Sequence, residues 1–313
     1  MSDLFANCLA GTDLQGHGSR YAGKVRDCYD AGETLLLVAS DRVSAFDRVI
    51  GLIPYKGQIL TQLAAYWFQE MGGRFPNHFL ECPDPAVTRV KKCTPFKLEM
   101  VVRAYLTGVT STSIFRHYER GQREFGGVRL PDGMKKNQPL PQPLLTPSTK
   151  ADVGLHDETV DQHALLERGL VSASDLQTIE RLCLDLFAHA SEKMRARGLL
   201  LVDTKYELGR DRDGRIVFID EVHTPDSSRI WDAADYETRL AAGDEPTSLD
   251  KEYLRRYLKE AGYTGDGSPP PLPDDVRLEM SRRYCTAYER VTGRVFVPNQ
   301  EPPLARIERN LSP

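Results

Sequence analysis

The sequence lacks the features that mark membrane, secreted and nucleic-acid-binding proteins. Its apolar runs, such as LLLVA at 35–39, are far too short to cross a bilayer, so we expect no membrane partner. The start, MSDLFANCLAG, has no basic residues followed by an apolar stretch, so we expect no secretory signal. A formal net charge of −4 gives no electrostatic reason to expect nucleic acid as a partner. The six cysteines are scattered without paired spacing, which favours reduced thiols in a cytoplasmic protein and disfavours a structural metal.

What is present is a globular composition, 40% hydrophobic and 27% charged over 313 residues. That length suits two domains, or one large domain with additions. Strand-like segments at 33–40 and 97–106, with a helical pattern at 60–71, indicate a small α+β lobe that ends near residue 104.

The second part of the chain alternates helices with extended segments. Apolar stripes predict helices over 173–198 and 274–292. The four prolines within 137–147 predict an extended connector at the surface, and we expect residues 297–313 to be loose.

Two strands in this part, 199–208 and 216–222, are separated by GRDRDGR. The dipeptide Asp213-Gly214 is a strong signal for a two-residue hairpin turn, because both central positions of that turn need positive φ. Such a turn would place Glu207 directly opposite Asp220.

Several acids would then share one face of this hairpin. Asp203 and Lys205 lie on the same face as Glu207, because side chains alternate along a strand. Carboxylates held opposite one another destabilise a hairpin unless a cation joins them, and an all-oxygen ligand set suits Mg²⁺. The alternative is a solvent-facing hairpin whose acids point apart.

The loop after the second strand, EVHTPDSSR at 221–229, adds donors to these acids. Asp226, Ser228 and Arg229 follow within a few residues, and hydroxyls beside a forked guanidinium are typical of phosphate-binding sites. A metal pair beside an anion site indicates an active centre that uses a nucleotide.

A glycine loop near the N-terminus, GSRYAGKV at 18–25, resembles a P-loop but fails at one position. Val25 stands where that motif needs a metal-binding hydroxyl, and the following residues indicate strand, turn and strand instead of a helix. A glycine hairpin that covers phosphates, with Lys24 reaching one of them, still fits. The alternative is an ordinary turn with an exposed lysine.

Together these segments resemble one family, phosphoribosylaminoimidazole-succinocarboxamide synthase (SAICAR synthetase), over about residues 20–295. The resemblance rests on GKVRD (23–27), SDRVSAFD (40–47), KGQILTQL (56–63), LEMVVRAYLTG (98–108), TPSTKADVGLHDE (146–158), LLVDTKYELG (200–209) and IDEVHTPDSSRIW (219–231).

The resemblance implies an α+β fold with a kinase-like N-terminal lobe, residues 1–104, and a larger ATP-grasp-like lobe, residues 105–313. ATP would lie in the cleft between them. The implied enzyme is an ATP-dependent ligase of de novo purine biosynthesis. It joins L-aspartate to 5-amino-1-(5-phosphoribosyl)imidazole-4-carboxylate through an acyl phosphate, and releases ADP and phosphate.

The family's site residues carry over position by position. The resemblance implies three catalytic residues, Lys205, Glu207 and Asp220, with Mg²⁺ held by Glu207 and Asp220 and supported by Asp203. The residues implied to bind ATP are Gly23, Lys24, Arg26, Glu99 and Lys205. Those implied to bind the imidazole nucleotide or aspartate are Arg103, Ser113, Lys150, His156, Asp157, Asp226, Ser228, Arg229 and Lys251.

One departure from the family pattern concerns a serine that binds substrate phosphate. Many members have it directly after the glycine of the TG pair, where this chain has Val109. Aligning leftward from Tyr118 makes Ser113 its counterpart, shifted by an insertion, and Thr110 and Ser111 stay open as alternatives.

Two other readings use the same residues. A small-molecule kinase would need the glycine loop and the acid pair, but the chain lacks the H-R-D and D-F-G sequences of protein kinases. A catalytically silent nucleotide-binding regulator would be favoured by missing metal acids, and these are present. The resemblance leaves monomer and homodimer open.

Overall fold

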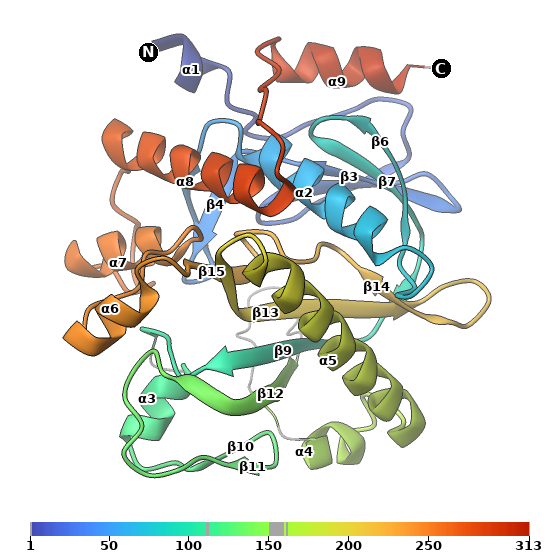
Figure 1. The fold of residues 1–313 in the computed structure, drawn as a ribbon. Helices are drawn as coiled ribbons and strands as arrows, with labels where there is room; N and C mark the ends of the chain where they lie inside the picture. Colours follow the sequence, from blue (N-terminus) through green and yellow to red (C-terminus); the bar gives the residue numbers. More distant parts are fainter. Residues whose placement is uncertain (1, 111–112, 150–159, 161, 313) are drawn as a thin grey trace.

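The computed structural model describes residues 2–110, 113–149, 160 and 162–312. It has an α+β fold in which two main antiparallel sheets are stacked along the molecule (Figure 1). Both termini lie at the end formed by the first sheet. Within the described residues, no helix is long and apolar enough to cross a membrane.

The first sheet has five strands in the order β1-β2-β3-β7-β6. Its strands are β1 (Ser19–Ala22), β2 (Arg26–Asp30), β3 (Thr34–Ala39), β6 (Phe79–Asp84) and β7 (Val87–Lys91). A separate hairpin is formed by β4 (Arg42–Ala45) and β5 (Arg48–Leu52). The glycine segment is the turn between β1 and β2, closed by Gly23 N donating to Arg26 O at 2.8 Å. The strand, turn and strand predicted after Val25, in place of a P-loop helix, are confirmed as β2, the turn closed by Ala31 N and Thr34 O, and β3.

The second sheet is built around one long strand, β13, which pairs with β9, β14, β15 and β8. Its strands are β8 (Thr94–Pro95), β9 (Leu98–Tyr105), β12 (Pro139–Thr149), β13 (Leu199–Arg210), β14 (Ile216–Ile219) and β15 (Ser228–Asp232). A small hairpin, β10 (Glu124–Phe125) and β11 (Val128–Arg129), lies beyond β12.

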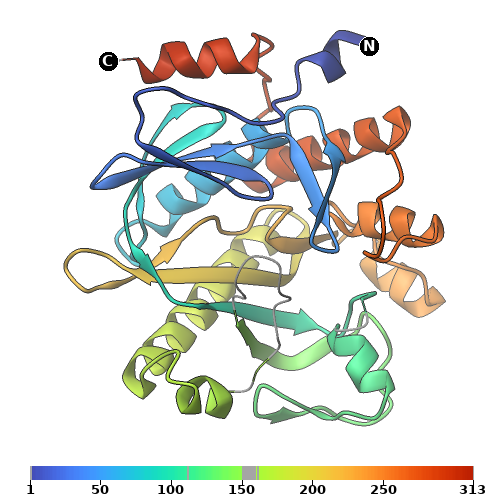
Figure 2. The same ribbon diagram turned by 180° about the vertical axis from the view of Figure 1, so that it is seen from behind.

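Two long helices were predicted from their apolar stripes, and both are confirmed. Helix α5 (Ala173–Arg195) packs on β13 and β9, and α8 (Asp274–Thr292) packs against α2 (Lys56–Met71) (Figures 1 and 2). The shorter helices are α1 (Ser2–Ala6), α3 (Ile114–Glu119), α4 (Gln162–Glu167), α6 (Tyr236–Ala242), α7 (Glu252–Glu260) and α9 (Pro303–Leu311).

Of two segments expected to lack regular structure or to serve as connectors, the proline segment is extended, as predicted, and the C-terminal tail is helical, which was not predicted. Residues 139–149 form the edge strand β12, which pairs with β9 on one side only. An edge strand tolerates prolines because the missing N–H groups can fall on the side that has no partner strand. The C-terminal residues form α9, which the expectation of a loose tail missed. Arg306 of α9 is buried and donates to both carboxylate oxygens of Asp84 on β6, at 2.9 and 3.0 Å.

The predicted boundary after residue 104 falls within β9, whose partners are strands of the second sheet. Helices α8 and α9, which follow that boundary, pack on elements of the first part. The division into lobes 1–104 and 105–313 therefore stays a prediction about folding units, whereas the sheets assign residues 98–104 to the second sheet.

A β-bulge decides which side chains of β13 face away from α5. Leu201 pairs with Ile230 and Asp203 pairs with Arg229, so two residues of β13 oppose one of β15. Before the bulge Leu201 lies in the core with α5, and after it Tyr206 does. A bulge reverses the alternation of faces. It thereby turns Asp203, Lys205 and Glu207 away from the core.

The predicted register of the β13–β14 hairpin is wrong by one residue. Glu207 pairs with Ile219 and not with Asp220. The loop contains five residues, 211–215, and is closed by Asp211 N donating to Arg215 O at 3.0 Å. Only Gly214 of the predicted turn pair has positive φ, and the Asp211 carboxylate accepts from two backbone N–H groups of the loop, so a two-residue turn does not form.

Candidate active site

A lysine surrounded by carboxylates lies on the face of β13 that is turned away from α5. Lys205 Nζ donates to Glu99 Oε1 at 2.7 Å and to Glu207 Oε1 at 2.6 Å. Burial by itself lowers the pKa of Lys205, but Glu207, Glu99 and Asp220 outweigh it and raise that pKa. We call Glu99, Lys205, Glu207 and Asp220 the acid cluster.

Asp220 reaches this cluster in spite of the shifted register. It follows β14 with φ of 64°, a left-handed conformation that redirects the chain at the end of the strand. Arg26 of β2 donates one Nη group to Asp220 and the other to Glu221. These contacts join the glycine hairpin of the first sheet to the end of β14.

The acid cluster has the donor chemistry of a magnesium site. No group of three or more His, Cys, Asp or Glu side chains forms a ready-made metal site in the part of the chain that the structure describes. Mg²⁺ commonly takes only one or two protein carboxylates and completes its octahedron with water and phosphate oxygens. Glu207 and Asp220 therefore fit a metal that arrives with a nucleotide.

A second charged group lies on the same face, two residues earlier on β13. Asp203 is directly paired with Arg103 of β9 on one side and with Arg229 of β15 on the other. Its Oδ2 accepts from Arg103 Nη1 at 3.3 Å and from Arg229 Nη1. We call these three residues the arginine row. Both guanidinium groups thus contact the same oxygen of the Asp203 carboxylate, and its predicted support of the metal stays a prediction.

The loop before β15 is held by a buried ionic contact that sequence reasoning missed. Asp226 Oδ2 lies 2.9 Å from Lys56 Nζ and 3.4 Å from Lys251 Nζ, and Oδ1 accepts from Tyr284 OH at 2.6 Å. Burial raises the pKa of Asp226, but Lys251, Lys56 and Tyr284 outweigh this and hold it well below its usual range.

Three residues predicted to bind substrate, Asp226, Ser228 and Lys251, have partners within the protein. The side chains of Asp226 and Lys251 are 5% and 11% exposed and lie against each other. Ser228 Oγ bonds to Thr204 Oγ1 at 2.8 Å. Because Thr204 alternates with Asp203, Ser228 points to the face opposite Arg229. Their predicted contacts with substrate stay predictions. Lys56 belongs to the KGQIL segment. Its position between apolar residues and Gly57 is the sequence signal that could have marked it as a buried cation.

The predicted ATP-binding residues of the glycine hairpin lie at its turn. Lys24 is more than half exposed and contacts Asp47 at 2.6 Å. The Gly23 amide is used within the turn itself. The predicted ATP-binding lysines and acid come from three places: the β1–β2 turn (Lys24), β9 (Glu99) and β13 (Lys205). Arg26 connects the glycine hairpin to the acid cluster through its contact with Asp220.

Ser113 begins α3 and is buried beside Gly108. A Cβ on Gly108 would lie 2.4 Å from Ser113 Cβ, and Gly108 has φ of 113°, so this position requires glycine. Among the described residues Ser113 Oγ has no hydrogen-bond partner. Ser111, Lys150, His156 and Asp157 lie outside the described residues, so their predicted roles stay predictions.

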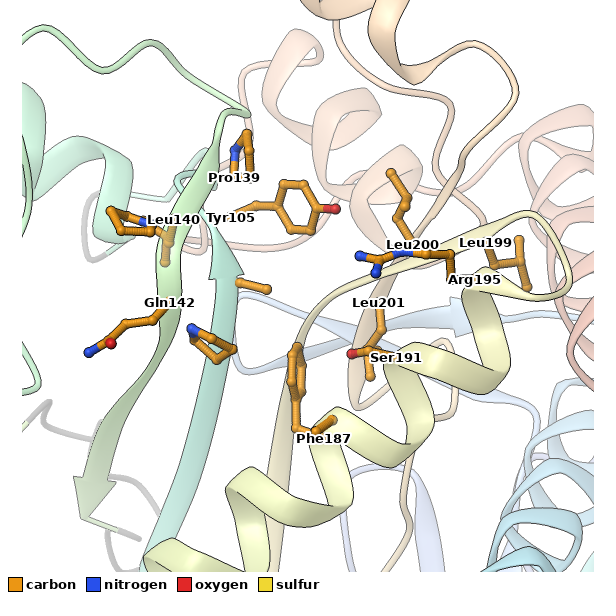
Figure 3. Close-up of a pocket in the computed structure, with 14 residues that line it drawn as sticks. Tyr105, Pro139, Leu140, Gln142, Phe187, Ser191, Arg195, Leu199, Leu200 and Leu201 are labelled. Carbon is orange, nitrogen blue, oxygen red and sulfur yellow. The ribbon is translucent and has the colours of Figure 1, made fainter.

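A pocket of about 230 Å³ opens elsewhere, between β12 and α5 (Figure 3). It is lined by Tyr105, Phe187, Arg195 and Leu201, together with the prolines of β12. Phe187 and Leu201 belong to the core beneath α5, so this pocket lies on the face of the second sheet opposite the acid cluster. No residue predicted for catalysis or binding lines it.

Comparison with known proteins yields consistent similarities. The model of the SAICAR synthetase family matches residues 19–270. A putative phosphoribosylaminoimidazole-succinocarboxamide synthase 2 of Agrobacterium fabrum is 45% identical over 296 residues, 94% of each chain. The phosphoribosylaminoimidazole-succinocarboxamide synthase of Legionella pneumophila (strain Paris) is 44% identical over 296 residues, again 94% of each. The structure of a SAICAR synthase from Saccharomyces cerevisiae in complex with SAICAR has a TM-score of 0.77 and 30% identity, and covers 92% of this chain and 99% of that one.

Proposed function

The chain belongs to the SAICAR synthetase family, and from that membership we propose how two charged clusters on β13 divide the work of its reaction. The protein is an ATP-dependent carbon–nitrogen ligase of purine biosynthesis. Its substrates are ATP, L-aspartate and 5-amino-1-(5-phosphoribosyl)imidazole-4-carboxylate, and its products are SAICAR, ADP and phosphate.

The acid cluster serves the nucleotide end of the reaction. Glu207 and Asp220 would hold Mg²⁺, which when bound neutralises charge on the ATP phosphates. Lys205 stays charged because Glu99 and Glu207 contact it, so it can bind a phosphate oxygen as substrate enters. In this proposal Lys24 and the turn at Gly23 cover the phosphates, and Glu99 and its backbone lie at the adenine edge.

The arginine row serves the imidazole nucleotide. Arg103 and Arg229 carry largely buried guanidinium groups on one face, and guanidinium groups are preferred ligands of phosphate. Ser113 adds a hydroxyl near the start of α3. Lys150, His156 and Asp157 face the acceptor or aspartate side in this proposal, while Asp226, Ser228 and Lys251 hold the loop that carries Arg229.

Positioning supplies most of the catalysis in this scheme. The γ-phosphoryl group of ATP passes to one oxygen of the substrate carboxylate, and ADP leaves. The aspartate amine then attacks the carbonyl carbon, the carbon–oxygen bond to phosphate breaks, and the amine loses a proton. The three reactants are anionic, so bringing them together requires cationic side chains to bind them and carboxylates to bind a metal ion. The single observation that carries the proposal is the occurrence of both arrangements on one face of β13.

Oxygen-18 labelling of the imidazole carboxylate tests this route. Each turnover should place one labelled oxygen in inorganic phosphate, and ADP release should fall to background when either aspartate or the imidazole carboxylate is omitted. Mass spectrometry of the phosphate decides the matter. Unlabelled phosphate alongside normal product would contradict an acyl phosphate, and labelled phosphate retained in a stable product would indicate a kinase.

The proposal also covers where the enzyme acts and how many chains it contains. We expect the reaction to take place in the cytoplasm, with small molecules as the only ligands required for turnover. Sedimentation of the purified protein would distinguish the monomer from the homodimer.

A further inference from the structure

Asp203 occupies the middle of the arginine row. Three neighbouring strands, β9, β13 and β15, place Arg103, Asp203 and Arg229 directly beside one another on one face. Adjacent strands lie about 4.8 Å apart, so the two arginine backbones are separated by roughly 10 Å with the acid between them.

The contacts of the row fix both guanidinium groups in similar ways. Asp203 Oδ2 accepts from Nη1 of each arginine. Arg103 Nε donates to Thr146 Oγ1 at 2.9 Å, and Arg229 Nε donates to Glu252 Oε2 at 3.3 Å. Among the described residues neither Nη2 group has a partner. In each guanidinium group Nε and Nη1 are therefore held, and Nη2 is the nitrogen left for a further acceptor.

Burial makes the acid necessary for this arrangement. The side chains of Asp203, Arg103 and Arg229 are 8%, 18% and 13% exposed, so little water reaches the charges. Two like charges held close together in such surroundings repel each other strongly. The carboxylate between them offsets this repulsion and sets the direction of both guanidinium groups.

We infer that Asp203 is a positioning and specificity residue for the substrate phosphate and takes no part in metal binding. It aligns Arg103 and Arg229 so that a phosphate monoester accepts from the Nη2 group of each. Its negative charge also weakens the attraction of the row for small free anions, which lack the ribose and imidazole contacts of the substrate. The row thus favours the imidazole nucleotide over inorganic phosphate, a product of the same reaction. This inference rests on the proposed function.

Asp203→Asn tests the inference by calorimetric titration with two probes, the imidazole ribonucleotide and inorganic phosphate. The variant should reduce the preference for the nucleotide over inorganic phosphate by roughly tenfold or more, as expected for misaligned charge-assisted contacts. Mn²⁺ affinity in the presence of a non-hydrolysable ATP analogue should stay at the wild-type value. An unchanged preference overturns the inference, and weaker Mn²⁺ binding returns Asp203 to the metal site.

Two further variants protect this test. Thr146→Val keeps every charge but removes the acceptor of Arg103 Nε, and should weaken nucleotide binding about two- to tenfold without changing Mn²⁺ binding. It decides the question if Asp203→Asn does not fold, and no effect of Thr146→Val on the nucleotide then counts against the inference. The matched control is Asp232→Asn, which breaks the ion pair of Asp232 with Arg290 at the other end of β15 and should change neither affinity.

The proposed function and this inference fail in different ways. Wild-type protein that releases no ADP in response to aspartate contradicts the proposed function. Wild-type protein that does so, with an Asp203→Asn variant that keeps its preference, contradicts only the role of Asp203.

Discussion

Two positions on β13, only two residues apart, have opposite charge arrangements around them. Asp203 is one acid between two arginines, whereas Lys205 is one cation among three carboxylates. In each case the central residue has the charge opposite to its neighbours and permits like charges to lie close together. The comparison shows how two groups of like charges can lie side by side on one strand without either group being left uncompensated.

Of the two regions, the acid cluster should show the larger loss of turnover when one residue is substituted. Asp220→Asn removes a charge that Arg26 contacts and that the proposed metal would need, while keeping the size of the side chain. We expect the variant to fold and to lose nearly all turnover, at least about a hundredfold, because replacing even outer partners of a metal costs roughly 10–100-fold. Steady-state kinetics over a range of Mg²⁺ concentrations measure this loss.

Asp213→Asn is the matched control, since Asp213 is an exposed acid in the loop of the same hairpin. It should keep wild-type turnover. Activity of Asp220→Asn within about threefold of the wild type, with unchanged Mg²⁺ dependence, would remove Asp220 from the metal site.

Substitutions in the arginine row should weaken binding of the imidazole nucleotide and leave the use of ATP unchanged. Arg229→Ala removes one of two guanidinium groups, and a charge-assisted contact of about 1.5–3 kcal/mol corresponds to roughly ten- to a hundredfold in affinity for the imidazole nucleotide. The KM for ATP should not change. Arg212→Ala, on the exposed hairpin loop, is the control. A rise in the KM for ATP as large as that for the imidazole nucleotide would show that the two regions are not separate.

A smaller effect of the same kind is expected at the start of α3. Ser113→Ala removes a neutral hydroxyl, so the affinity for the imidazole nucleotide should fall by less than in Arg229→Ala, about two- to tenfold. Ser111→Ala should leave the affinity unchanged. If Ser111 is the sensitive residue, the insertion after Gly108 has been placed wrongly.

Much of the architecture could be predicted because it depends on local patterns. The stripes of α5 and α8 repeat at helical spacing, and Val25 together with the following strand pattern excluded a P-loop. The expected two-lobe architecture and the ligand assignments came from the family resemblance. The match to the family model confirms that the chain belongs to this family.

What could not be predicted depends on the backbone between patterns. The five-residue loop at 211–215 shifted the register, and the positive φ of Asp220 brought its carboxylate back to the cluster. The bulge at Leu201 and Asp203 reversed the faces of β13 without any glycine to mark it. The contact of Lys56 with Asp226 joins residues that are far apart in the chain, and no local spacing indicates it.

The central claim is that the two regions of β13 bind different ligands, and a paired equilibrium titration tests it most directly. Mn²⁺ with a non-hydrolysable ATP analogue, and separately the imidazole ribonucleotide, would be titrated into Glu207→Gln and Arg103→Gln. We predict that Glu207→Gln loses Mn²⁺ binding and keeps the imidazole nucleotide, and that Arg103→Gln does the reverse. Equal losses of both ligands in both variants, with each variant folded, would contradict the claim.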